Sequence, residues 1–253
     1  LQCRNHILKP LAEKYGIDTS DEAIRAAVEQ HNEVCRLIRA IGDFRKEANP
    51  RVTGYEFHIL TLVSYVAPKH LIVDKLRETL EEIKTREPDA ADKYRARVVF
   101  VGSEVDDVDV IRLVEESGAY VCADRFCYGS LPGRDEILLN DDEDVVKQVC
   151  RQMQGRAQCP RYWDMAKMTG RRDYVADLAK EYGADGIIYE QMKFCDPWAY
   201  ERMIGTIVLR DEHGYPVLAV DRPYSIGSSG QMRTRVQAFV ESIEIKKIQG
   251  GKK

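Results

Sequence analysis

The chain has 253 residues, 44% of them hydrophobic, and is long enough to bury the core of one large domain or two ordinary ones. Its 38 basic and 42 acidic residues leave a net charge of -4. This balance argues against a nucleic-acid-binding or membrane-surface protein, because both need a strongly basic face. The most apolar run, residues 59–68, is far shorter than the roughly 18 residues of a membrane span.

We expect a cytoplasmic protein. The seven cysteines are odd in number and irregularly spaced, unlike the disulfide framework of a secreted protein. Polar residues 3–6 would interrupt a signal peptide. Cys35 and Cys150 stand in apolar helical stripes and are expected to be packing residues, the usual role of a free cysteine. Because the chain begins with Leu1, we expect a processed or truncated piece.

Residues 1–95 are predicted to form a helical segment. Thr19 and Glu22 form a candidate capping box, and apolar residues recur at helical spacing after it. Asn49-Pro50 is expected to end this helix. Further helices are predicted over 54–66 and 70–85.

Residues 96–253 alternate between strand and helix patterns. Short apolar runs predict strands over 98–101, 120–123, 185–189 and 216–220. Amphipathic stretches predict helices over 106–117, 141–154, 171–182, 197–209 and 230–245. This alternation is typical of βαβ units. We therefore predict an α/β fold, in which a helical segment precedes a Rossmann-like (flavodoxin-like) domain with a four-stranded parallel sheet.

Ligands of such sheets bind beyond the carboxyl ends of the strands. Four segments should share that edge: residues 102–104, 124–129, 191–196 and 221–230. The first of them contains no GxGxxG turn, which weighs against a dinucleotide.

The start of the last predicted helix carries anion-binding features. Ser229, Gly230 and Gln231 begin this helix, and the free backbone N–H groups of a helix start attract anions. Arg233 and Arg235 add positive charge close by. One interpretation is a site for a phosphate, a thioester oxygen or an anionic cluster. The other is a serine-capped helix with solvated arginines.

Two loops carry further cysteines. Asp124, Arg125 and Cys127 follow the second predicted strand, and Cys159 precedes Pro160, which favours an extended loop. The loop from Asp124 either lines a substrate or cluster site, or is an aspartate-capped turn with a buried cysteine. Cys159 by itself indicates little.

Cys195 follows the third strand and lies just before Pro197, which is expected in the first turn of a helix. A helix start favours the thiolate form. A nucleophilic cysteine needs a base, usually histidine, and we expect none of the five histidines at this edge. A soft-metal or iron–sulfur ligand needs only other thiolates, and Cys127 and Cys159 are the candidates. A buried, inert cysteine remains the alternative.

Four motifs occur in a recognisable order along the chain. They are Cys127 with Gly129-Ser130, Cys159-Pro160, Phe194-Cys-Asp-Pro197, and the run from Gly230 to Phe239. Together with Asn32-Glu33 and Thr53-Gly54, they resemble the 2-hydroxyacyl-CoA dehydratase and benzoyl-CoA reductase family, of the 2-hydroxyglutaryl-CoA dehydratase D-component type. The resemblance covers nearly the whole chain, and the last two motifs are the specific ones.

The resemblance implies an oxygen-sensitive iron–sulfur subunit with a [4Fe-4S] cluster. Such a subunit pairs with a homologous second subunit in a heterodimer. An ATP-dependent activator iron–sulfur protein supplies one electron at low potential. In the dehydratases this electron converts a CoA thioester into a ketyl radical, and in the reductases similar electrons enter an aromatic ring.

Residue by residue, the resemblance makes Cys195 a cluster ligand. Cys127 and Cys159 match family motifs and are possible further ligands. Two segments are expected to line the CoA thioester: the helix start Ser229–Arg235, and Asp124 with Arg125. The chain resembles the C-terminal portion of a longer subunit. The alternatives are a cluster-carrying electron-transfer protein of the double-cubane type and a non-catalytic Rossmann-like binding domain.

Overall fold

A computed structural model describes residues 2–90, 93–130, 135–156, 158–162, 164–224 and 229–250. The part before the sheet is helical, as predicted. It contains a short π-helical stretch Arg4–Leu8, α1 (Lys9–Tyr15), α2 (Asp21–Asp43), a 3-10 turn Phe44–Lys46, α3 (Gly54–Val66) and α4 (Lys69–Thr85). No helix among the described residues is long and apolar enough to cross a membrane.

The helix boundaries correct two expectations. The predicted Thr19–Glu22 capping box is wrong, because Ser20 caps α2 by accepting a hydrogen bond from Ala23 N at 3.2 Å. Also, α2 ends at Asp43 and passes into the 3-10 turn well before Asn49. A reciprocal capping box instead starts α3, where Thr53 Oγ1 accepts from Glu56 N and Glu56 Oε2 accepts from Thr53 N.

Four parallel strands form one sheet, which confirms the predicted fold class. They are β1 (Ala96–Gly102), β2 (Ala119–Arg125), β3 (Gly186–Met192) and β4 (Val217–Arg222). Their order is β2-β1-β3-β4. Val98 pairs with Val121 of β2 and Gly186 of β3. The strands are apolar because both faces of a parallel sheet are covered by helices.

Helices cover the two faces of the sheet. On one face, α5 (Val108–Glu116) and α9 (Ser229–Gly250) bury Val114 and Val240 against Phe100. On the other, α7 (Met165–Glu181) and α8 (Asp196–Asp211) bury Ala179 and Trp198 against Tyr189. The helix that follows β1 therefore covers one face of the sheet, and the helix that follows β3 covers the other. Such a topological switch between neighbouring strands opens a crevice at their carboxyl ends.

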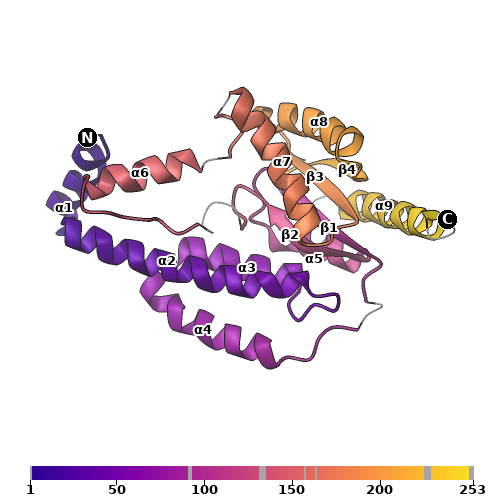
Figure 1. Cartoon of the computed structure of the whole chain (residues 1–253), viewed down its shortest axis with the longest axis horizontal. Coiled ribbons are helices and arrows are strands. Elements are labelled where there is room, and N and C mark those ends of the chain that lie inside the picture. The colour runs from indigo at the N-terminus through magenta and orange to yellow at the C-terminus, as the bar shows by residue number, and fades with distance from the viewer. Residues whose placement is uncertain are drawn as a thin grey trace.

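The connection from β2 to α7 makes a long excursion. Its helix α6 (Val145–Gly155) lies apart from the sheet, beside α2 (Figure 1). Arg4 Nε donates to Asp144 Oδ2 at 2.8 Å, just before α6. Asn32 of α2 exchanges two hydrogen bonds with the backbone of Ile137, at 2.8 and 2.9 Å. The excursion then returns to the carboxyl edge of the sheet with Gln158 and Cys159.

Arg45 joins the helical part to the sheet. It is fully buried, and its guanidinium carbon lies 3.6 Å from the ring centroid of Phe57 at the start of α3. Its Nη1 donates to Asp124 Oδ1 at 3.1 Å, where β2 ends. Because a buried cation needs a paired anion, Asp124 is part of this junction.

Candidate functional site

A cavity of about 610 Å³ opens at the carboxyl edge of the sheet, at the switch between β1 and β3. The segments after β1, β2 and β3 line it, together with the returning connection. The lining residues used below are Ser103, Arg125, Cys127, Cys159, Cys195 and Trp198. The three cysteines singled out from the sequence therefore share one cavity, although they come from three separate loops.

Cys127 lies between an apolar wall and a hydrogen-bond donor. Trp198 Nε1 donates to its sulfur across 3.3 Å. Burial raises the pKa of the Cys127 thiol, whereas the Trp198 N–H and the cationic Arg125 oppose this rise. Cys159 and Cys195 are near enough to raise this pKa a little further by charge repulsion. The three sulfurs therefore form an electrostatically connected group.

Cys195 occupies the N-cap position of α8, and Pro197 lies in the first turn, as predicted. A tight turn from β3 presents it. Cys195 N donates to Met192 O at 3.1 Å, and Phe194 adopts the left-handed region at φ 71°. A non-glycine residue rarely adopts this conformation without support from its surroundings. The backbone of this turn therefore fixes the position of the Cys195 sulfur.

Arg125 contributes a buried positive charge to the cavity wall. It is 2% exposed, and its guanidinium carbon lies 4.7 Å from the Trp198 ring centroid. It donates to Gln158 Oε1 at 3.3 Å and to the Gln158 backbone oxygen, next to Cys159. Burial lowers the pKa of Arg125, but a guanidinium stays charged in proteins. Arg125 thus anchors the loop of Cys159 and places a cation beside the thiols.

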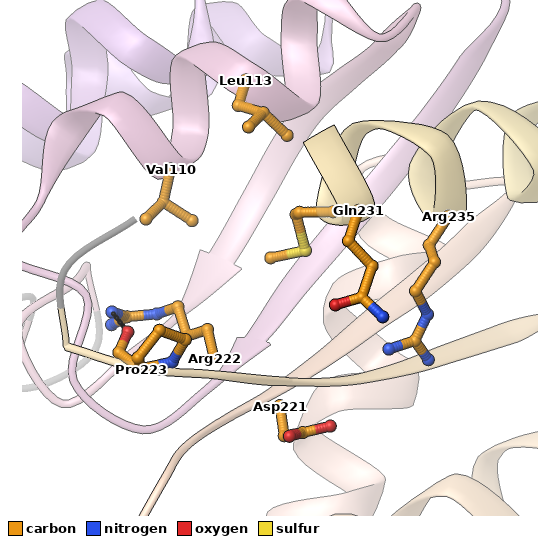
Figure 2. Close-up of a pocket in the computed structure, with 8 residues that line it drawn as sticks. Val110, Leu113, Asp221, Arg222, Pro223, Gln231 and Arg235 are labelled. Atoms are coloured by element: carbon orange, nitrogen blue, oxygen red, sulfur yellow. Dashed lines mark hydrogen bonds between the residues drawn. The ribbon is translucent and has the colours of Figure 1, made fainter. Parts of the chain in front are cut away.

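The other sequence-predicted residues lie elsewhere. Asp124 is buried, pairs with Arg45, and accepts from Ser130 N at 2.7 Å, so it fixes the loop that bears Cys127. Gln231 and Arg235 extend from α9 toward β4, which carries Asp221, and all three residues line a separate pocket of about 30 Å³ (Figure 2). Arg235 Nη2 donates to Ala219 O at 2.6 Å.

The remaining members of the helix start are at the surface. Arg233 forms an ion pair with Glu116 of α5 at 2.9 Å, and Gly230 is exposed. Ser229 is the first residue of α9. Within the described ranges, the pocket at α9 and the cysteine cavity share no lining residue. The structure therefore groups Arg125 with the three cysteines and places the α9 residues on the other face of the sheet.

The donor set of the cavity is soft. Thiolates are the ligands that iron–sulfur clusters and other soft metals prefer. In the part of the chain that is described, no three His, Cys, Asp or Glu side chains are gathered closely enough to hold a metal ion. A cubane cluster binds each thiolate through a different iron atom, so its ligands stand farther apart than those around one ion. Three soft donors on one cavity match the ligand type of such a group.

Sequence reasoning missed several residues that build this site. Trp198, Ser103, Glu190 and Arg222 were not singled out, although all four lie at the carboxyl ends of the strands or just beyond them. Glu190 and Arg222 are buried charges at the ends of apolar strands. Charged residues are seldom fully buried without a partner, and the partnership of these two became visible only with the order of the strands.

The fold and the site together define an α/β subunit with a thiol-lined cavity at the switch point of a parallel sheet. The model of the 2-hydroxyglutaryl-CoA dehydratase D-component family matches residues 4–243, so the chain belongs to this family.

Three relatives illustrate the range of the family. The chain is 26% identical over 230 residues to the (R)-phenyllactyl-CoA dehydratase beta subunit of Clostridium sporogenes, covering 90% of this chain and 59% of the relative. It is 25% identical to (R)-2-hydroxyglutaryl-CoA dehydratase, subunit beta, of Acidaminococcus fermentans (92% and 61%). It is 22% identical to a subunit of benzoyl-CoA reductase from Thauera aromatica (95% and 62%). The chain thus spans about three fifths of the length of these relatives.

Proposed function

We propose that this chain is part of the iron–sulfur subunit of a 2-hydroxyacyl-CoA dehydratase or benzoyl-CoA reductase-type enzyme. The observation that carries the proposal is the convergence of Cys127, Cys159 and Cys195 on one cavity at the switch point of the sheet. Membership of the family supports CoA thioesters as the substrate class. The relatives are each named as one subunit of an enzyme, which supports a companion for this chain.

Cys195 would hold a [4Fe-4S] cluster together with Cys127 and Cys159. Such clusters usually have four thiolate ligands, so one further ligand comes from beyond these three. The cluster supplies single electrons at low potential when bound. The residues of the chain prepare its place: the Arg125 guanidinium offsets the negative charge of the thiolates, and the Trp198 N–H donates to the sulfur of Cys127.

The remaining walls of the cavity suit an acyl group. Met192, Phe194, Pro197 and Trp198 give them apolar surface. An adjoining polar cleft of about 650 Å³ shares Arg156 and Gln158 with the cavity.

The cleft also holds Arg39, Lys46 and Lys167, beside the carboxylates of Asp43, Asp135, Asp177 and Glu181, and its cations are one proposed contact for the phosphates of CoA. Cations and free N–H groups near a helix start attract phosphates. The start of α9, with Gly230, Gln231, Arg233 and Arg235, is the other proposed contact for CoA.

The companion of this chain would be a homologous second subunit in a heterodimer. An ATP-dependent activator iron–sulfur protein would deliver the electron, in the cytoplasm and without oxygen. The second subunit and the activator are both proposed from the family. Enzymes that use single electrons at low potential need a separate electron donor and a cluster that is shielded from oxygen.

The test is the iron and acid-labile sulfide content of the anaerobically purified full chain, compared with Cys195→Ala. Cys150→Ala is a matched control, because Cys150 is also partly exposed but lies on α6, outside the cavity. We expect the Cys195 variant to lose iron and sulfide together and the control to keep both. Equal iron in all three proteins would refute the assignment.

Retention on immobilised CoA tests the substrate class separately. We expect Lys167→Ala or Arg235→Ala to weaken retention, depending on which of the two surfaces binds the nucleotide end. Iron without any CoA affinity would instead favour a cluster-carrying electron-transfer protein.

A further inference from the structure

Ser103 connects the two cysteine loops of the sheet. It follows β1 at the topological switch point and is fully buried. Its backbone oxygen accepts from Cys127 N at 3.0 Å, on the loop after β2. Its hydroxyl oxygen accepts from the N–H of Met192 at 2.7 Å, the last residue of β3, directly before the turn that carries Cys195. One residue therefore bonds to the backbone of one loop and to the strand end from which the other begins.

The Ser103 hydroxyl is held in one orientation by Glu190. It donates to Glu190 Oε2 at 2.9 Å, and Ser103 N donates to the same oxygen at 3.1 Å. A serine hydroxyl has one proton, so donating it to Glu190 leaves a lone pair for Met192 N. The carboxylate thus determines that the hydroxyl accepts from Met192, directly before the cysteine-bearing turn.

Arg222 at the end of β4 neutralises Glu190. Its Nε lies 2.8 Å from Glu190 Oε1, and the two residues are 5% and 0% exposed. The guanidinium also donates to the backbone oxygens of Glu104, Pro223 and Tyr224. Removing one partner of such a buried pair would leave the other charge uncompensated, which is strongly destabilising.

Gly102, the last residue of β1, lies directly against Glu190. A Cβ at Gly102 would lie 2.5 Å from Glu190 Oε2 and would also collide with the Glu190 backbone oxygen. Glycine is therefore required where β1 passes the Glu190 side chain. This close approach keeps Ser103 within hydrogen-bond distance of the Glu190 carboxylate.

We propose that Ser103 is a positioning residue that sets the distance between the sulfurs of Cys127 and Cys195, and that Glu190 and Arg222 hold its hydroxyl for this purpose. The inference builds on the proposed function, in which both sulfurs hold one cluster. Neither Ser103 nor Glu190 need contact the cluster, because each acts through the backbone of the cysteine loops.

A thiol ruler tests the spacing without a cluster. The cluster-free full chain is treated with bis-maleimides of increasing spacer length, and peptide mapping reports which lengths bridge Cys127 to Cys195. Ser103→Ala removes the hydroxyl but leaves the backbone bond to Cys127. We expect its cross-linking yield at the best wild-type length to fall several-fold, with a broader range of bridging lengths. Ser103→Thr keeps a hydroxyl and should restore the wild-type profile.

Ser117→Ala is the matched control for the loss of a buried serine hydroxyl. Ser117 is 2% exposed and donates to Leu113 O at 2.7 Å, at the other end of the sheet. Its cross-linking profile should match the wild type. An unchanged profile in Ser103→Ala, with only a lower melting temperature, would overturn the proposal.

The second readout is the electron paramagnetic resonance spectrum and iron content of the reconstituted full chain. Ser103→Ala should lose part of its iron or show an altered spectrum, and Ser117→Ala should show neither. If the wild type binds no iron but the thiol ruler still responds to Ser103→Ala, the cluster assignment fails and the positioning role stands. If iron binds and both readouts ignore the substitution, only the positioning role fails.

Discussion

The indole N–H of Trp198 donates to the sulfur of Cys127 across 3.3 Å, and the Arg125 guanidinium stacks over the same indole. Hydrogen bonds to cluster sulfurs raise the reduction potential, since they stabilise the more negative, reduced state. One such bond is worth about 1 kcal/mol, or roughly 40 mV for a one-electron couple.

Trp198→Phe should therefore make the reduction potential of the proposed [4Fe-4S] cluster more negative by tens of millivolts, measured by redox titration. Tyr189→Phe is the control, because Tyr189 packs against Trp198 at 6.2 Å between ring centroids and belongs to the same apolar cluster. A shift of equal size in both variants would show that packing, and not the N–H donor, sets the potential.

A buried ion-pair network joins α7 to α8. Glu201 is 3% exposed and accepts from Arg171 Nη2 at 3.1 Å and Arg172 Nε at 3.0 Å. Glu201→Ala would leave Arg171 buried without its counter-charge, which costs about 3–5 kcal/mol. Urea unfolding measures this loss.

The exposed Arg210–Asp211 pair is the matched control for this network. Asp211→Ala should leave the unfolding midpoint unchanged, because exposed ion pairs contribute little. A midpoint for Glu201→Ala equal to that of Asp211→Ala would contradict the expected role of burial.

Glu115 makes the stability of the fold depend on pH. Its carboxylate accepts from Gly54 N, Tyr55 N and Val121 N, so it joins the start of α3 to β2. Burial raises the pKa of Glu115 to about 7, although these N–H groups oppose the rise. The folded chain therefore holds this proton more tightly than the unfolded chain.

The contribution of Glu115 is fully present below the unfolded pKa of about 4.3 and is lost as the pH rises through the folded pKa. We expect the melting temperature to fall between about pH 5 and about pH 8, and Glu115→Gln to reduce this slope. Melting curves across this range test the expectation, and an identical slope in the variant would contradict it.

Thr53 caps α3 and thereby supports the junction with β2. Its side chain accepts from Glu56 N at 3.0 Å. Thr53→Ala should lower the free energy of unfolding by about 1 kcal/mol, the usual worth of an N-cap. Thr85→Ala, at the exposed last residue of α4, should change it by less than about 0.5 kcal/mol. Similar losses in the two variants would exclude capping as the cause.

The sheet was predictable from sequence because each strand centre is an apolar run between helices. The strand ends were not, because Arg125, Glu190 and Arg222 end the apolar patterns while the ladder continues, as in the pairing of Glu190 with Val220. These polar ends are buried by mutual pairing and hydrogen bonds. A single-sequence pattern does not show such partners.

The sequence also supplied the three cysteines and their edge of the sheet, but not their arrangement. The convergence of Cys127 and Cys195 follows from the neighbouring strand order β2-β1-β3. That of Cys159 depends on the excursion through α6 and on Arg125, which bonds to Gln158. Arg235 lies on the other face because α9, which follows β4, covers the face opposite to the one that α8 covers after β3. Local sequence does not encode this change of face.

The excursion through α6 gives the three sulfurs different mechanical supports. Cys127 and Cys195 lie on the loops that directly follow β2 and β3 of one sheet. Cys159 lies on a chain segment that is clamped between Arg125 of β2 and Arg171 of α7, whose Nη1 donates to Tyr162 O at 3.3 Å. The position of the Cys159 sulfur therefore depends on two arginine side chains, whereas the spacing of the other two sulfurs follows from the ladder of neighbouring strands.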